Sequence, residues 1–129
     1  MPAPIRILIA DDHAPFRRML QSLLGKFGAE ILECRGGQEA VERYHNFAPD
    51  WVLMDIEMPC LDGISATEQI ITTSPQARIL ILTQHDDEDA RQAAREAGAR
   101  WFLAKDELDQ LPAILFSPHN DNVSADSLV

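Results

Sequence analysis

Basic residues are scarce in this sequence: 11 lysines and arginines stand against 21 aspartates and glutamates, which gives a net charge of −10 over 129 residues. Proteins that bind nucleic acids need clustered basic side chains to neutralise phosphates, so the excess of acid argues against direct contact with DNA or RNA. It argues equally against binding to an anionic membrane surface. The acids either keep the protein soluble or form a cluster that needs a cation.

Cysteines and long apolar runs are also scarce. The two cysteines, Cys34 and Cys60, lack the spacing of metal ligands, so we expect both to be reduced, as in the cytoplasm. No stretch approaches the ~20 apolar residues of a membrane span. Residues 1–4 lead directly into a short strand-like run, without the apolar region of a signal peptide. The sequence therefore predicts a cytoplasmic protein that needs no disulfide, because a chain of this length can bury a sizeable core.

Short apolar runs alternate with helical patterns along the chain. Each run is too short for a helix and rich in aliphatic residues, whereas the segments between them repeat apolar residues at helical spacing. The predicted strands are 5–10, 29–34, 51–54, 78–82 and 100–104. The predicted helices are 15–27 with Pro15 in the first turn, 38–47, 64–71, 86–97 with the acidic residues 86–89 at its start, and 108–116. This order predicts an α/β domain over residues 1–116, with a five-stranded parallel sheet covered on both faces. The polar residues 117–129 are expected to be a disordered tail or linker.

Polar residues follow four of the five predicted strands. Asp11 and Asp12 follow the first strand, Asp55 the third, Thr83 the fourth and Lys105 the fifth. Ligands of open α/β sheets bind outside the carboxyl ends of the strands, so these side chains should converge if the first and third strands are neighbours. Three adjacent carboxylates cannot all ionise cheaply without a counter-ion. The strand ends therefore predict a cation site.

The residue types in this set suit phosphoryl transfer. Mg²⁺, for which Mn²⁺ could substitute, takes carboxylate oxygens and offsets the charge of a phosphoryl group. A lysine supplies a positive charge for a phosphate, and a threonine hydroxyl can donate to a phosphoryl oxygen. An ionised carboxylate is itself a nucleophile and needs no general base. The pattern indicates that Asp55 becomes phosphorylated.

Motifs at the strand ends add a resemblance to a known family. They are 7–13 (ILIADDH), 51–59 (WVLMDIEMP) with Asp62-Gly63, 81–87 (ILTQHDD) and 97–106 (AGARWFLAKD). In this order and spacing, over about residues 5–116, they resemble the receiver domain of bacterial two-component response regulators. The similarity is greatest to the NarL–FixJ-like subgroup, which is usually followed by a LuxR-type DNA-binding domain. The resemblance implies a flavodoxin-like doubly wound fold with strand order 2-1-3-4-5.

The resemblance also implies a role for each residue of the set. Asp55 matches the phosphoacceptor, and Thr83 and Lys105 match the pair that binds the phosphoryl group. Phe102 matches the switch aromatic, which packs inward when the threonine moves towards the phosphoryl group. The Mg²⁺ ligands that it implies are Asp11, Asp12, Asp55 and the backbone carbonyl of Glu57.

Partners follow from the same resemblance. The phosphodonor would be a phosphohistidine on a histidine kinase or phosphotransfer domain, and phosphorylation would switch a surface that binds a downstream protein or a second copy of the chain. Residues 117–129 are too few for a LuxR-type domain, so we expect no DNA-binding output domain in this chain. We expect no enzymatic activity beyond the protein's own phosphorylation and dephosphorylation.

Two alternatives stay open. A degenerate receiver would bind its partner without phosphorylation. A Mg²⁺-dependent phosphatase would use Asp55 as nucleophile, but such enzymes usually carry a second aspartate two residues on, where this chain has Glu57. Three residues depart from the family pattern near the site. Cys60 replaces a frequent glycine and is expected to stiffen its loop, Phe102 lacks the hydroxyl of the commoner tyrosine, and Gln84 is larger than the usual small residue.

Overall fold

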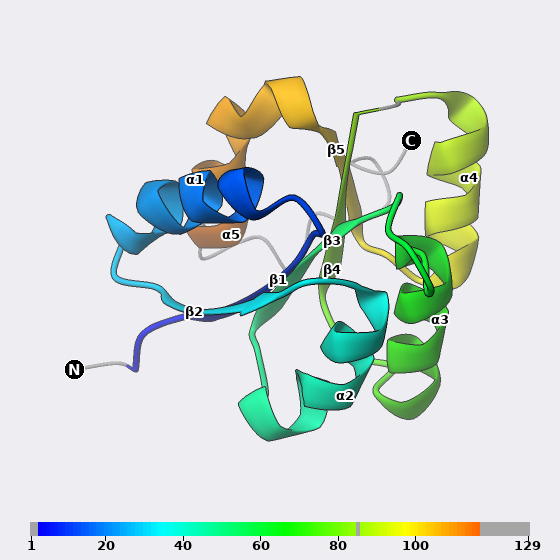
Figure 1. Ribbon diagram of the computed structural model, residues 1–129, viewed down its shortest axis with the longest axis horizontal. Coiled ribbons are helices and arrows are strands. Elements are labelled where there is room, and N and C mark those ends of the chain that lie inside the picture. Colours follow the sequence, from blue (N-terminus) through cyan, green and yellow to red (C-terminus); the bar gives the residue numbers. More distant parts are fainter. Residues whose placement is uncertain (1–2, 85, 117–129) are drawn as a thin grey trace.

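Strands and helices alternate along the chain in the computed structural model, which describes residues 3–84 and 86–116 (Figure 1). The strands are β1 (Arg6–Ala10), β2 (Glu30–Cys34), β3 (Trp51–Asp55), β4 (Ile79–Thr83) and β5 (Trp101–Ala104). The helices are α1 (Ala14–Gly25), α2 (Gly37–Phe47), α3 (Gly63–Thr73), α4 (Glu88–Ala97) and α5 (Leu111–Phe116), and a 3₁₀ segment, η1 (Lys105–Gln110), precedes α5. The tail predicted for 117–129 lies outside the described residues.

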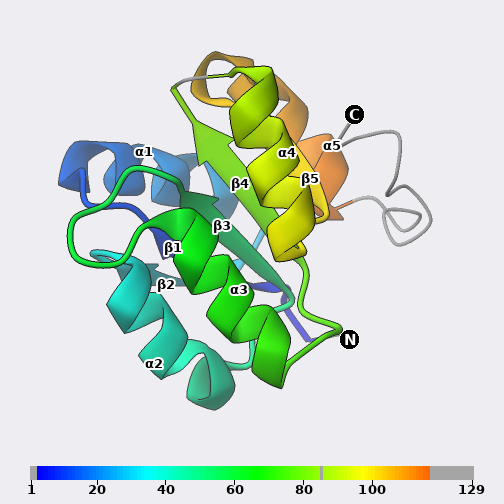
Figure 2. The same cartoon turned by 90° about the vertical axis from the view of Figure 1, so that its right-hand side faces the viewer.

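The five strands form one parallel sheet in the order β2-β1-β3-β4-β5. Helices α1 and α5 cover one face of this sheet, and α2, α3 and α4 cover the other (Figures 1 and 2). Because β2 and β3 flank β1, the direction in which strands are added reverses at β1, which is the topological switch point of the fold. The predicted flavodoxin-like fold and its strand order are confirmed.

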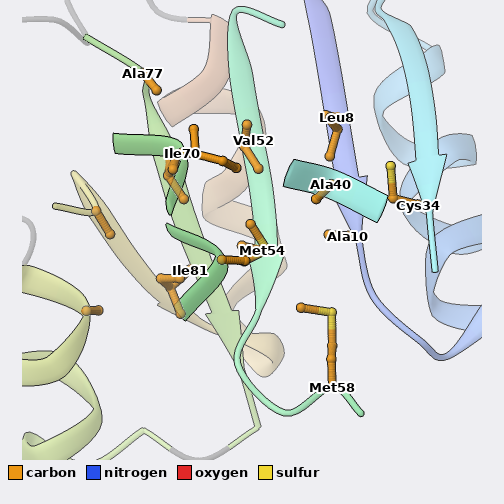
Figure 3. Close-up of a cluster of buried hydrophobic side chains, with 14 of the residues drawn as sticks. Leu8, Ala10, Cys34, Ala40, Val52, Met54, Met58, Ile70, Ala77 and Ile81 are labelled. Atoms are coloured by element: carbon orange, nitrogen blue, oxygen red, sulfur yellow. The ribbon is translucent and has the colours of Figure 1, made fainter. Parts of the chain in front are cut away.

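Each face of the sheet has its own hydrophobic core, because β1, β3 and β4 are buried on both faces. On the face of α2, α3 and α4, strand residues such as Leu8, Val52 and Ile81 pack with Ala40 of α2 and Ile70 of α3 (Figure 3). The core on the other face contains Ile7, Ile9, Leu53 and Leu80 of the strands, Leu20 and Leu24 of α1, and Leu111 and Leu115 of α5. These two cores hold the carboxyl ends of β1, β3 and β4 at one edge.

The first four helices lie within two residues of their predicted bounds. Helix α1 begins at Ala14, and Pro15 lies in its first turn as predicted. The single helix predicted for 108–116 is wrong, since the chain forms η1 and then α5. Pro112 has no N–H to donate to the carbonyl of Leu108, so a continuous helix is interrupted there. No helix within the described residues is long and apolar enough to cross a membrane.

Candidate functional site

Three polar side chains lie at the carboxyl ends of adjacent buried strands. The register pairs Ala10 with Met54, which sets Asp11 beside Asp55 just past this pair. It also pairs Asp55 with Leu82, so that Thr83 lies one residue further along the edge. Asp11, Asp55 and Thr83 are 2%, 7% and 2% exposed. Polar groups enclosed to this degree need partners, so their grouping at one edge marks a site.

The carboxylates of Asp11, Asp12 and Asp55 each offer an oxygen, and these oxygens lie within 4.8 Å of one another. The backbone N–H of His13 donates to Asp11 Oδ1 at 2.8 Å and orients that carboxylate. Asp12 is exposed, so one side of the cluster faces water. A hard cation such as Mg²⁺ takes oxygen ligands and keeps several waters, and this donor set fits such an ion.

Lys105, the first residue after β5, extends its ammonium group into the acidic cluster. Its Nζ lies 2.8 Å from Asp11 Oδ2 and 3.6 Å from Asp55 Oδ1. The pKa of Asp55 is raised from 3.8 to about 6, mainly by burial. The charges of Asp11 and Asp12 also raise this pKa, whereas Lys105 lowers it. One ammonium group does not balance three carboxylates, so the site retains an affinity for further positive charge.

A surface hollow of about 350 Å³ lies beside the carboxyl ends of β3 and β4. Two predicted site residues, Glu57 and Thr83, line it together with Ile56, Asp87 and Ala90. Ile56 and Glu57 directly follow Asp55 in the chain, so the hollow lies beside the loop that leaves β3. The structure thus gathers Asp11, Asp12, Asp55 and Lys105 in one cluster, whereas Thr83 and Glu57 line the hollow.

The loop after β3 holds the Asp55 backbone against the start of α3. The N–H of Gly63 donates to the carbonyl of Ile56 at 2.8 Å, and a Cβ at Gly63 would overlap the carbonyl oxygen of Asp55. In the same loop, Cys60 has a φ of 72°, a left-handed conformation that glycine adopts without strain. This conformation explains why glycine suits position 60, whereas the stiffening of the loop by cysteine stays a prediction.

Sequence and structure both relate the chain to known proteins. Residues 7–116 match the response regulator receiver domain. The chain belongs to this family. The receiver domain is 42% identical over 101 residues to the chemotaxis protein CheY of Bacillus subtilis, covering 78% of this chain and 84% of that protein. The resemblance to receiver domains is thereby confirmed.

Two solved structures extend this relation. A LuxR-family two-component response regulator from Aurantimonas sp. SI85-9A1 has a TM-score of 0.79 and 31% identity, covering 94% of this chain and 95% of that one. A chain of the CheX–CheY–BeF₃–Mg²⁺ complex from Borrelia burgdorferi has a TM-score of 0.78 and 27% identity, covering 86% of this chain and 89% of that one. The receiver fold is therefore common to this chain and to both of these structures.

In this receiver domain the predicted switch aromatic, Phe102, is 3% exposed. The guanidinium carbon of Arg91, on α4, lies 4.7 Å from the centroid of the Phe102 ring. Arg91 also donates to both carboxylate oxygens of Asp86, at 2.7 and 3.0 Å. These hydrogen bonds raise the pKa of Arg91 and lower that of Asp86. Sequence reasoning found the aromatic but missed Arg91, because an acid and an arginine five residues apart are a weak signal.

Helix α1 adds two residues that sequence reasoning did not assign to the site. Arg17 donates to the backbone carbonyl of Asp11 at 2.6 Å and pairs with Glu33 at 3.0 Å, so it ties the end of β1 to β2. The ring of Phe16 lies over Lys105 Nζ, 4.2 Å from the ring centroid. The helical pattern placed Phe16 on the buried face of α1, and no sequence signal links it to a lysine after β5.

Proposed function

We propose that Asp55 accepts a phosphoryl group from a phosphohistidine on a histidine kinase or phosphotransfer protein, and that this modification switches the binding of a downstream protein. The observation that supports the proposal is the Lys105 ammonium group between Asp11 and Asp55, beside a third carboxylate. A merely structural ion pair would need one acid per base. Three acids around one base instead suit a site that takes up a cation and a phosphoryl group.

The proposed transfer breaks the N–P bond of the donor and forms a bond between phosphorus and a carboxylate oxygen of Asp55. The carboxylate supplies the electron pair, and the imidazole of the donor leaves with the electrons of the N–P bond. Lys105 would offset the charge of the phosphoryl group, and the hydroxyl of Thr83 would donate to one of its oxygens. A divalent cation would supply further charge neutralisation, held by Asp11, Asp12, Asp55 and the backbone carbonyl of Glu57.

The partners of this receiver domain are part of the same proposal. The Borrelia burgdorferi CheY chain was solved with BeF₃, Mg²⁺ and the protein CheX. By analogy, this domain would bind beryllofluoride and Mg²⁺ at its acidic cluster and present a changed surface to another protein or to a second copy of itself. The covalent reaction ends on Asp55 of the same chain, so we propose no turnover of a separate substrate.

Intact-mass spectrometry after incubation with acetyl phosphate and Mg²⁺ tests this proposal. The mass of the wild-type protein should rise by one phosphoryl group, and Asp55→Asn should abolish the rise. Asp109→Asn serves as the matched control, because Asp109 is an exposed aspartate of η1 and should leave labelling unchanged. A chelator should also suppress labelling. Equal labelling of Asp55→Asn, or no labelling of the folded wild type, would overturn the proposal, and the latter would favour a receiver that binds without phosphorylation.

A further inference from the structure

The ammonium group of Lys105 is enclosed on three sides. Two sides are the carboxylates of Asp11 and Asp55, at 2.8 and 3.6 Å from Nζ. The third is the aromatic face of Phe16, whose ring centroid lies 4.2 Å from Nζ. The lysine side chain is 13% exposed as a result. Lys105 is therefore held by an aromatic ring as well as by its acidic partners.

The position of the Phe16 ring is set by the start of α1. The N–H of Phe16 donates to the carbonyl of His13 at 3.1 Å, and Arg17 ties the same turn to the carbonyl of Asp11. The ring also packs against the hydrophobic core beneath α1 and α5. The ring is therefore attached to the backbone segment that carries the acidic cluster and is held by the core beneath α1.

An anchored ring affects a lysine in two ways. The face of the ring carries partial negative charge and attracts the ammonium group. The ring also replaces water on one side of that group, and a charge with less water around it interacts more strongly with its partners. A lysine needs this help more than most residues, because its charge lies at the end of a flexible four-carbon chain.

We propose that Phe16 is a positioning residue for phosphoryl transfer to Asp55. Its ring keeps the Lys105 ammonium group between the carboxylates of Asp11 and Asp55. The lysine is therefore already ordered when the phosphoryl group arrives, and binding that group costs it no further conformational entropy. The inference rests on the proposed function of Asp55 and adds a residue from another element to that site. It predicts that an aromatic face is needed at position 16, and that apolar packing alone does not suffice.

Rates of labelling by acetyl phosphate and Mg²⁺ test the inference through two substitutions. Phe16→Leu retains apolar packing but removes the aromatic face, and its rate constant should fall about three- to tenfold, as expected for the loss of an ammonium–ring contact. Phe16→Tyr retains the face and should stay within about twofold of wild type. Phe27→Leu is the matched control, because Phe27 follows the far end of α1 and stacks on Phe116, at 4.8 Å between centroids. It should label at the wild-type rate.

A second background shows whether Phe16 acts through Lys105. Lys105→Met should label more slowly than wild type, and adding Phe16→Leu to it should cause no further loss. A structural role of Phe16 would slow labelling both with and without Lys105. Melting curves identify any variant that does not fold, and Phe16→Met then replaces Phe16→Leu. Wild-type labelling with an unchanged rate in Phe16→Leu would overturn this inference alone. Absent wild-type labelling would overturn the proposed function instead.

Discussion

Gly63 supports the backbone of Asp55, and its replacement by alanine should destabilise this receiver domain. A Cβ at position 63 would overlap the carbonyl oxygen of Asp55 and lie 2.8 Å from its carbonyl carbon and 3.0 Å from the Cα of Ile56. All three atoms belong to the backbone, so no side-chain rotation relieves the overlap. Alanine can be accommodated only if α3 or the end of β3 moves.

The magnitude follows from what that movement disturbs. Overpacking of a close-packed interior costs about 1–3 kcal/mol, and the hydrogen bond from Gly63 to Ile56 contributes about 1 kcal/mol more if it breaks. Alanine recovers about 1 kcal/mol, because it is a better helix former than glycine. The free energy of unfolding should therefore fall by about 1–3 kcal/mol. For a domain of this size the melting temperature falls by about 4 °C per kcal/mol, so the expected decrease is about 4–12 °C.

Thermal and urea unfolding of Gly63→Ala and Gly25→Ala measures this effect against a matched control. A Cβ at Gly25, in the last turn of α1, would meet no atom within 4 Å. Gly25→Ala should therefore leave stability unchanged or raise it by up to about 1 kcal/mol. Labelling of the folded Gly63→Ala protein should also be slower than that of Gly25→Ala, because the backbone of Asp55 moves. If Gly63→Ala melts within about 2 °C of wild type, the steric argument is refuted.

Three further predictions concern the same edge of the sheet. Because the pKa of Asp55 rises from 3.8 to about 6 in the fold, its charge destabilises the metal-free protein fully above pH 6 and not at all below about pH 4. In the presence of a metal chelator, Asp55→Asn should thus raise the free energy of unfolding by up to about 3 kcal/mol at pH 7–8. Urea unfolding at a series of pH values should show this gain falling to zero near about pH 4. A gain independent of pH would contradict the prediction. Mg²⁺ should raise the melting temperature of wild type reversibly, and Asp12→Asn should weaken that rise, whereas equal shifts in both proteins would remove Asp12 from the metal site. Asp62 Oδ1 accepts a hydrogen bond from the N–H of Ser65 at 2.8 Å at the start of α3, so Asp62→Ala should cost about 1 kcal/mol in urea unfolding and Asp62→Asn clearly less; equal losses would argue against the cap.

The fold and most of the site could be predicted because burial leaves a periodic pattern in the sequence. Five short apolar runs and the helical patterns between them determine the parallel sheet. The acids, the threonine and the lysine were identified because each lies at the carboxyl end of a predicted strand. The prediction of a single last helix was wrong, because Pro112 in a short helical pattern permits either a late start of the helix or an interruption of it.

Contacts between distant segments could not be predicted in this way. Arg91 lies on Phe102, and Phe16 lies on Lys105, across elements that the sequence does not relate to one another. In both pairs the aromatic residue fits an apolar pattern, which gives no indication that its face holds a cation. The close approach of Gly63 to Asp55 likewise depends on the path of the loop between β3 and α3.

The sequence by itself determined the class of fold, the family, and the residue types at the strand ends, since each of these depends on local spacing. Only the tertiary structure decided how the charges are arranged. It placed one ammonium group against two buried carboxylates, left Asp12 exposed and covered Lys105 with a ring. The physical reason is that burial and charge proximity, which raise the pKa of Asp55, arise only when separate strand ends meet at one edge of a sheet.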